Sequence, residues 1–248
     1  MKYCAVIPAA GKASRLQYSL PKLLLPLSRT ETIWSRLRQR LSKAGIDHIH
    51  VVVSPQNQST ITQALQADIQ DGLVSLSIQT KPIGMGDAIF CGYSVWSQAE
   101  AVLIIWGDQA CVSEKTMRHA LSLHEKTAKT VVLPLCETNK PYVEYIFSQQ
   151  GQLIQIKQSR EGDQCNPRGL ADVGTFVLSV EKLHEAWKIY LQKQPRGNTT
   201  QEINFLPFIV MLAQLGWQIR PYIVDDPLET QGINTRQEWE LIREHFAK

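Results

Sequence analysis

The stretch that decides the fold is residues 3–27, YCAVIPAAGKASRLQYSLPKLLLPL. Its apolar opening, residues 3–7, predicts a strand buried on both faces, as in a parallel sheet. A turn of small residues, Pro8-Ala9-Ala10-Gly11, follows. Because a strand that ends in a tight glycine turn leaves backbone N–H groups free, this turn is a candidate anion-binding loop.

Three cations follow the turn within eleven residues: Lys12, Arg15 and Lys22. Lysine and arginine bind phosphate oxygens through charge-assisted hydrogen bonds, so the turn and these cations together suit a polyphosphate. The simpler alternative is a β-turn followed by solvated charges, which Gly11 alone would fit equally well.

Strands and helices alternate through the first 135 residues. Apolar runs predict strands, and apolar residues spaced three to four apart predict helices. The expected elements are strands at 2–8, 48–54, 73–79, 101–106 and 130–135, and helices at 31–44, 57–67, 84–96 and 113–126. This alternation predicts an α/β fold with a doubly wound, mostly parallel sheet and right-handed crossovers.

The pattern changes after residue 136. A hairpin is expected over 142–148 and 152–158, because Gln149-Gln150-Gly151 separates the two runs. The remaining expected elements are a polar loop at 159–169, strands at 173–179 and 217–224, a loop at 225–233, and helices at 180–192, 199–215 and 235–246. The chain therefore reads as one domain, 1–248, whose second half adds a small β-rich extension.

The composition excludes several classes of protein. The net charge of the 248 residues is +3, from 26 basic and 23 acidic side chains, which argues against nucleic-acid binding. No apolar run reaches the ~18 residues of a membrane span, and no signal peptide precedes the first strand. Five scattered cysteines without a C-x-x-C pair predict reduced thiols in a cytoplasmic protein and no zinc site, with Cys4 and Cys91 in the core.

Two further motifs lie at the predicted carboxyl ends of strands, where ligands bind in such sheets. The first is QTKPIGMGDA, residues 79–88. The Gln79 amide can donate to and accept from a base edge, and Gly84 and Gly86 permit close backbone approach. The second is Gly107-Asp108, where the carboxylate can hold Mg²⁺. The alternatives are a plain strand-to-helix connection and an aspartate that caps the next loop.

These motifs resemble those of the sugar-1-phosphate nucleotidyltransferases. Residues 9–16 with Pro21-Lys22 are similar to L-A-A-G-x-G-x-R-(M/L)…P-K, with Ala13 at the second glycine. Residues 79–88 are similar to the Q-x(4)-G-T-(A/G)-x-A base-reading motif of uridylyltransferases, with Met85 at the threonine. Gly107-Asp108 is similar to G-D-x-P, with Ala110 at the proline, and residues 232–236 to G-(V/I)-N-x-R.

The resemblance covers nearly the whole chain and is strongest to the N-terminal domain of bacterial N-acetylglucosamine-1-phosphate uridylyltransferases, within the MobA-like NTP transferase superfamily. It implies a Rossmann-like, GT-A-like fold with a nucleotide-binding half, 1–135, and an acceptor-binding half, 136–248. It assigns catalysis to Arg15, on the leaving pyrophosphate, and to Lys22, on the α-phosphate. The nucleotide-binding residues that it implies are Ala9, Ala10, Gly11, Lys12, Gln79, Gly84, Met85 and Asp108.

The resemblance also implies a Mg²⁺ cofactor on Asp108 and Asn234. The alternative for Asn234 is the N-cap of the last helix, and both roles are compatible. Asp225 and Asp226 lie just upstream, where one of them could be a further ligand, although loop acids are usually solvated.

The acceptor side departs most from the family. Gln158 and Asp172 stand where relatives bind the sugar with a glutamate and an asparagine, and PYVEY, residues 141–145, replaces a Gly-Tyr-Gly segment. The acceptor residues that the resemblance implies are Tyr142, Glu144, Gln158, Asp172 and Gly174, with Thr199, Thr200 and Gln201 near the sugar side.

The sequence thus predicts NMP transfer from an NTP, UTP first and CTP second, to a sugar 1-phosphate or similar phosphorylated acceptor, with release of pyrophosphate. One alternative is a cytidylyltransferase that acts on a phospho-alcohol, polyol phosphate or phosphonate. Another is a catalytically silent paralogue that binds nucleotide sugar and regulates a partner. The expected partners are the NTP and the acceptor, without nucleic acid or membrane, and oligomerisation is left open.

Overall fold

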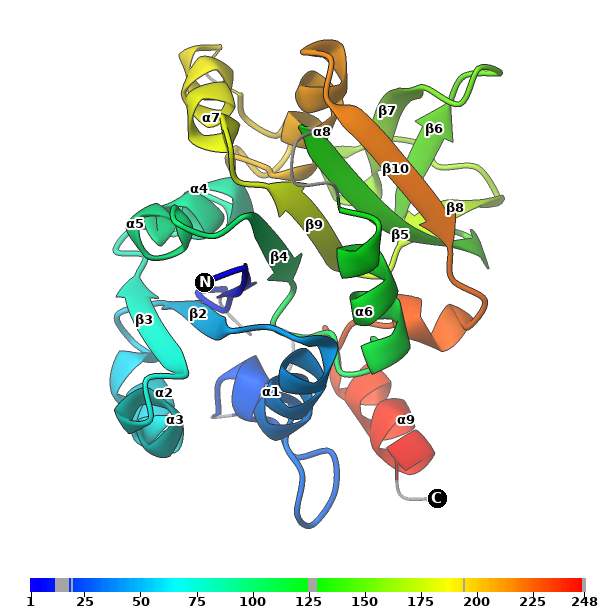
Figure 1. Ribbon diagram of the computed structural model, residues 1–248. Coiled ribbons are helices and arrows are strands. Elements are labelled where there is room, and N and C mark those ends of the chain that lie inside the picture. The colour runs from blue at the N-terminus through cyan, green and yellow to red at the C-terminus, as the bar shows by residue number, and fades with distance from the viewer. Residues whose placement is uncertain (12–17, 19, 125–128, 194, 247–248) are drawn as a thin grey trace.

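The computed structural model describes residues 1–11, 18, 20–124, 129–193 and 195–246. Strands and helices alternate through the first part of the chain (Figure 1). The strands are β1 (Tyr3–Pro8), β2 (His48–Val53), β3 (Val74–Ile78), β4 (Ala101–Ile105), β5 (Thr130–Asn139), β6 (Val143–Phe147), β7 (Leu153–Gln158), β8 (Arg168–Asp172), β9 (Thr175–Ser179) and β10 (Gln218–Ile223).

The α-helices are α1 (Ile33–Ala44), α2 (Gln58–Ala64), α3 (Gln66–Gln70), α4 (Met85–Cys91), α5 (Tyr93–Trp96), α6 (Glu114–Ser122), α7 (Leu183–Gln192), α8 (Leu206–Gln214) and α9 (Arg236–Phe246). Three short 3₁₀ helices are η1 (Lys22–Leu24), η2 (Ser159–Glu161) and η3 (Pro227–Thr230). No helix in the described part of the chain is long and apolar enough to cross a membrane.

The ten strands of the described residues form one sheet, in the order β3-β2-β1-β4-β9-β5-β8-β6-β7, with β10 beside β5. The pairs β3-β2, β2-β1 and β1-β4 are parallel, as predicted. From β9 onward the pairs along this path are antiparallel, while β10 pairs parallel with β5. The sheet is therefore mixed, with a parallel core and an antiparallel extension.

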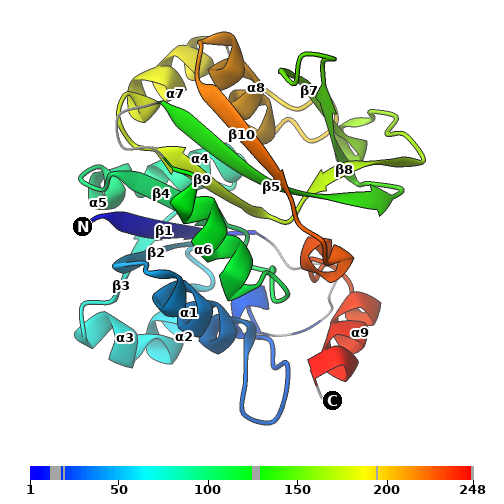
Figure 2. The ribbon, with the colours of Figure 1, turned by 45° about the vertical axis from the view of Figure 1, so that its right-hand side comes forward.

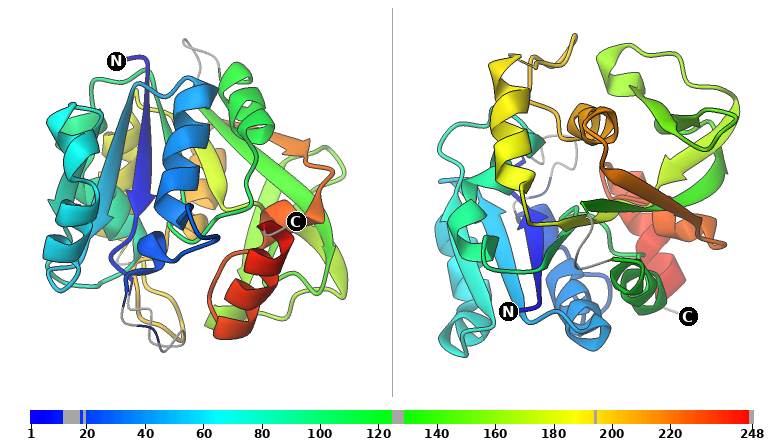
Figure 3. Two further views of the ribbon diagram at one scale, coloured as in Figure 1. Left: turned by 90° about the horizontal axis from the view of Figure 1, so that it is seen from below. Right: turned by 45° about the horizontal axis from the view of Figure 1, so that its top comes forward.

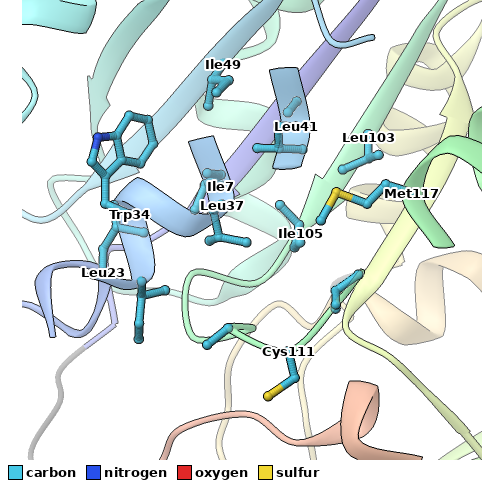
Figure 4. Close-up of a cluster of buried hydrophobic side chains, with 14 of the residues drawn as sticks. Ile7, Leu23, Trp34, Leu37, Leu41, Ile49, Leu103, Ile105, Cys111 and Met117 are labelled. Atoms are coloured by element: carbon cyan, nitrogen blue, oxygen red, sulfur yellow. The ribbon is translucent and has the colours of Figure 1, made fainter. Parts of the chain in front are cut away.

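The sheet is covered on both faces, which explains the unbroken apolar run of β1. Ala5 and Ile7 point into one core cluster with α1 and α6, whereas Cys4 and Val6 point into a second cluster with α4, α7 and α8. Figure 4 shows the first cluster, where Ile7 and Leu103 face Leu37 and Leu41 of α1. Burial of both faces removes the polar alternation of a half-exposed strand.

The covering helices lie in two layers. Helices α1 and α6 lie side by side on one face (Figure 2), and α7 and α8 lie on the opposite face (Figure 3). Helix α1 begins with a capping box between Thr32 and Ser35 and ends at Gly45, whose φ of 94° is left-handed. The helix therefore ends where the sequence predicts, before a glycine that can adopt the left-handed conformation.

The predicted strand 173–179 is wrong in its first two residues. Gly174, with φ 72°, interrupts it between β8 and β9, and β8 begins inside the predicted 159–169 loop. Strand β9 then inserts antiparallel between β4 and β5, pairing with both. As a result β5, expected to continue the parallel core, lies one strand further away.

The predicted helices 57–67 and 84–96 are each two helices. Helix α2 ends at Ala64, with Leu65 as its C-cap residue, and α4 ends at Cys91, with Gly92 as its C-cap residue. A methyl group at Gly92 would overlap the His50 ring, which Ser75 and Ser77 hold by hydrogen bonds of 2.8 and 2.7 Å. Burial lowers the pKa of His50 to about 4, so this ring is neutral at pH 7. The prediction that Cys91 is in the core is wrong, because Cys91 is exposed.

The predicted helix 199–215 begins only at Leu206. The preceding segment crosses the start of α4 instead: Ile203 donates its N–H to the Ile83 carbonyl at 2.7 Å and accepts from the Gly86 N–H at 3.0 Å. Gly84, with φ 134° and ψ 167°, lies directly beneath. A methyl group at Gly84 would come within 2.5 Å of both the nitrogen and the oxygen of Ile203.

This crossing predicts that Gly84→Ala destabilises the protein far more than Gly151→Ala. Both glycines have positive φ, but nothing lies within 4 Å of a methyl group at Gly151. We expect a loss of about 1 kcal/mol for Gly151→Ala and about 3 kcal/mol or more for Gly84→Ala, which adds a glycine-only backbone region and a backbone clash. Chemical denaturation measures both values, and equal losses would contradict the role given to the crossing.

Candidate active site

Three side chains from distant parts of the chain meet at one point. The Lys22 ammonium donates to Oδ2 of Asp108 at 3.1 Å and to Oδ1 of Asn234 at 2.9 Å. The side chains of Lys22 and Asp108 are 25% and 19% exposed, so a ligand can reach them. The cluster therefore presents one cation and two oxygen ligands at a partly buried position.

Each of the three side chains is placed by its own local structure. Lys22 opens η1, which Leu23 and Leu24 anchor in the core. Asp108 follows the buried strand β4, and its carbonyl accepts from the Ile233 N–H at 3.2 Å. This bond brings the end of β4 beside the segment that leads into α9, at the carboxyl ends of β1 and β4 (Figure 2).

The start of α9 leaves the Asn234 side chain available. Thr235 Oγ1 accepts from the Glu238 N–H at 3.2 Å, and the Glu238 carboxylate accepts from the N–H groups of Thr235 and Asn234, both at 2.7 Å. Thr235 and Glu238 thus form the capping box. The alternative that Asn234 caps this helix is therefore wrong, and its amide oxygen faces Lys22.

The capping alternative for Asp108 is also not what the structure shows. Ser113 caps α6 by accepting from the Thr116 N–H, whereas the Asp108 carboxylate accepts from Lys22. Of the two upstream acids, Asp226 caps η3 through the Leu228 N–H at 2.9 Å. The Asp226 carboxylate therefore already has a hydrogen-bond partner within the protein, the Leu228 N–H.

The predicted phosphate loop lies next to this cluster. A methyl group at Gly107 would touch Ala9 at 3.5 Å, and the Ala9 N–H donates to the Val52 carbonyl at 2.7 Å. Ala10 is buried, whereas Gly11 is exposed, and nothing lies within 4 Å of a methyl group added at Gly11. Lys12 and Arg15 lie outside the described residues.

The base-reading motif has internal partners. Gln79 is 6% exposed, and its amide nitrogen donates to the Gly84 carbonyl at 3.0 Å and to the Asp87 carboxylate at 2.7 Å. Both amide hydrogens are used, so only the carbonyl oxygen of Gln79 is left for a base edge. Gly84 and Gly86 lie against Ile203 rather than facing outward, and Met85 packs on the second core cluster.

Two of the predicted acceptor residues lie near the cluster. Asp172 ends β8 and accepts from the Gly174 N–H at 2.8 Å. Burial raises the pKa of the Asp172 carboxyl to about 6, against the hydrogen bond from the Gly174 N–H. Gly174 contacts the side chain of Gln109, which follows Asp108 directly and also lies beside Gly232.

The other three predicted acceptor residues lie on the β6-β7 hairpin. Tyr142 is 56% exposed, and Gln158 is buried at the register position opposite Val143. Glu144 is buried and accepts from the backbone and side-chain amides of Asn166 at 2.9 and 2.6 Å. Burial raises the pKa of Glu144, but the Asn166 hydrogen bonds and the Lys157 ammonium outweigh it and give a net decrease. Glu144 is thus already satisfied by the protein.

The oxygen pair of Asp108 and Asn234 suits Mg²⁺. Carboxylate and amide oxygens are its preferred protein ligands, and here both lie within 3.1 Å of one cationic nitrogen. Among the described residues, no group of three or more His, Cys, Asp or Glu side chains could hold a metal. Mg²⁺ sites with one or two protein ligands usually take the rest of their shell from water and substrate phosphates.

Comparison with known proteins decides the family. A sequence model of the MobA-like NTP transferase domain matches residues 5–173, more than half of the chain. The chain belongs to the MobA-like NTP transferase family. The resemblance to this family is thereby confirmed, and the matched residues include the predicted phosphate loop, the predicted base-reading motif and Asp108.

Curated relatives of this chain include two proteins that are each named bifunctional protein GlmU. The protein from Desulfitobacterium hafniense is 24% identical over 240 residues, which cover 94% of this chain and 50% of the relative. The protein from Acidithiobacillus ferrooxidans is 24% identical over 245 residues, 98% of this chain and 51% of the relative. The chain thus spans about half the length of these relatives.

A solved structure confirms the fold. It is described as a nucleotidyl transferase from Methanothermobacter thermautotroptrophicus, and it superposes with a TM-score of 0.68 at 19% identity. The match covers 99% of this chain and 98% of that one, so the antiparallel extension belongs to the shared fold.

Two buried polar residues, Gln109 and Glu161, were not identified from the sequence. Gln109 is 5% exposed, and its Oε1 has no hydrogen-bond partner among the described residues. Glu161 accepts from the N–H groups of Thr199 and Thr200 at 3.0 and 3.2 Å and from the Asn204 amide at 2.8 Å. Only its position next to Asp108 could have singled out Gln109, and no local pattern marks Glu161.

The segment that precedes α8 is held in an irregular form. Gln201 has a left-handed φ of 58°, and the Glu161 carboxylate accepts from the N–H groups of Thr199 and Thr200. Burial raises the pKa of Glu161, but hydrogen bonds from Thr200, Asn204 and Thr199 outweigh it and lower the pKa to about 2. The ionised carboxylate is therefore the form that holds this segment.

This pKa predicts a pH-dependent stability. Because the folded pKa lies below the unfolded value of about 4.5, the contribution of Glu161 is fully present above pH ~4.5 and disappears as the pH falls toward ~2. We expect Glu161→Gln to lower the melting temperature at pH 7 and to differ much less from wild type at pH 3. Glu185→Gln, which alters an exposed carboxylate on α7, is the control and should shift neither value.

Proposed function

We propose that this chain transfers a nucleoside monophosphate from an NTP to a small phosphorylated acceptor and releases pyrophosphate. The observation that carries the proposal is the meeting of Lys22, Asp108 and Asn234 beside the Ala9–Gly11 turn. A cation and two oxygen ligands at the carboxyl edge of a parallel sheet suit a triphosphate and its metal. A cytoplasmic location and a single catalytic domain are part of the same proposal.

The reaction needs little proton transfer. A phosphate monoester has a second pKa of about 6 and is largely dianionic at pH 7, so it can attack the α-phosphorus in line without a strong base. The protein then contributes positioning and charge neutralisation. Lys22 neutralises the α-phosphate, where charge develops, and Arg15 binds the pyrophosphate that leaves.

Mg²⁺ would be held by Asp108 and Asn234. When bound, it supplies charge neutralisation to the phosphate oxygens of both substrates. Gly11 and its neighbours donate backbone N–H groups to the triphosphate, as turns after parallel strands do.

A pyrimidine nucleotide is the proposed donor, UTP first and CTP second. The Gln79 carbonyl oxygen can accept from N3–H of uracil or from the exocyclic amine of cytosine. The order rests on the similarity of residues 79–88 to uridylyltransferase motifs. Because this oxygen serves either base, cytidylyl transfer to a phospho-alcohol, polyol phosphate or phosphonate is the second candidate.

The test is pyrophosphate release from UTP, CTP, GTP and ATP, each with sugar 1-phosphates, polyol phosphates and phosphonates. We expect turnover with UTP or CTP and a loss on the order of 10²-fold in Lys22→Ala, because an electrostatic contact to the transition state disappears. A GTP or ATP preference would contradict the base assignment. The absence of turnover with every pair would favour the silent paralogue.

Asp172 predicts the chemistry of the acceptor. Its carboxylate accepts hydrogen bonds, so we propose an acceptor with hydroxyl or amine donors that differs from N-acetylglucosamine 1-phosphate. Because the pKa of Asp172 is about 6, the KM for such an acceptor should rise as the pH falls below 6. The acceptor phosphate titrates in the same range, so the measurement is the ratio of KM in Asp172→Asn to KM in wild type between pH 5 and 8.

We expect this ratio to be high at pH 8 and to approach one at pH 5. A ratio that does not change with pH would show that Asp172 does not bind the acceptor. High activity only with N-acetylglucosamine 1-phosphate would refute the proposed departure on the acceptor side.

A further inference from the structure

Lys22 has two tasks that require two positions. As the cation at the α-phosphate it must face the NTP, yet its ammonium lies between the two oxygens proposed to bind the metal, 3.1 Å from Asp108 and 2.9 Å from Asn234. A divalent ion bound to the same two oxygens would lie where the ammonium lies. Two cations cannot share that position, because they repel each other strongly at contact distance.

We propose that Lys22 and the divalent cation alternate at Asp108 and Asn234, so that Lys22 lowers the affinity of the protein for free metal. The inference rests on the proposed function and adds to it a competition between Lys22 and the metal for the same two oxygens. The triphosphate draws the Lys22 ammonium away from the two oxygens and thereby opens the metal position. Metal and NTP then bind cooperatively, and each raises the affinity for the other by the same factor.

The local structure allows the exchange without a change of fold. Leu23 and Leu24 are buried and fix η1, so the backbone at Lys22 stays in place. The lysine side chain has a flexible four-carbon stem, and its head is only partly buried. Asp108 and Asn234 keep their positions without Lys22. The Asp108 carbonyl accepts from the Ile233 N–H, and the Thr235 capping box fixes the backbone next to Asn234. Only the ammonium has to move.

The size of the effect follows from occupancy. An apparent dissociation constant rises by the reciprocal of the fraction of molecules that are competent to bind. If the ammonium holds the two oxygens in about nine molecules of ten, free metal binds about tenfold more weakly than it would without Lys22. A variant that lacks the ammonium should therefore gain metal affinity while it loses turnover.

The experiment measures binding of Mn²⁺ alone to the full chain by electron paramagnetic resonance, without nucleotide. Lys22→Met keeps the length of the side chain and removes the charge, and we expect it to bind Mn²⁺ about tenfold more tightly than wild type. Lys43→Met removes the same charge from the exposed end of α1 and should leave the affinity unchanged. Thermal denaturation shows that each variant is folded, and Lys22→Gln serves as a second neutral variant.

Three results would overturn the proposal. Mn²⁺ affinity in Lys22→Met equal to or below that of wild type would show that the ammonium does not compete. An equal gain in Lys43→Met would reduce the effect to net charge. If the double variant Lys22→Met, Asp108→Asn still bound Mn²⁺ tightly, the metal would bind elsewhere. The assignment of Asp108 and Asn234 as metal ligands in the proposed function would then also be wrong. Loss of the tight site in that double variant, with a gain in Lys22→Met, supports both.

Discussion

The contact of the Lys22 ammonium with Asp108 and Asn234 is the constraint on which the rest of the site depends. Its partners lie 86 and 212 residues away in the sequence, so it forms only when η1, the end of β4 and the start of α9 are all in place. An ion pair that solvent can still reach, as here, contributes only about 0–1 kcal/mol to stability. The contact gathers charge at one point of a scaffold that the two cores stabilise, and the proposed function rests on this cluster.

The scaffold can gather this charge because the parallel strands end at one edge. Strands β1 and β4 are neighbours, and the loops after them bring Ala9 and Gly107 so close that a methyl group at Gly107 would touch Ala9. Helix α9 then returns to the same edge, where the Trp239 indole donates to the Pro26 carbonyl at 2.8 Å. The last helix is thus fixed to the segment that carries Lys22, and Asn234 reaches the cluster from a helix start rather than from a strand end.

The parts of the site that lie in short continuous motifs could be predicted from the sequence. The Pro8–Gly11 turn, Gly107-Asp108 and Asn234 each stand in a short pattern, and the rule for parallel sheets places the first two at one edge. The insertion of β9 between β4 and β5 could not be predicted, because strand order depends on pairing between distant segments. The same holds for Glu161, whose partners lie 38 to 43 residues further along the chain. Whether the predicted residues bind a nucleotide and an acceptor stays a prediction.

The segment from Thr199 to Phe205 connects Glu161, which follows the β6-β7 hairpin, with the predicted base-reading motif at the start of α4. At one end Glu161, from the end of the β6-β7 hairpin, holds its backbone. At the other end Ile203 is hydrogen-bonded to both sides of Gly84, in the base-reading motif. A shift of either anchor must therefore be taken up by the other, because the segment between them is only a few residues long. Glu161 and the predicted base-reading motif, which lie far apart in the sequence, are in this way linked through one short segment of backbone.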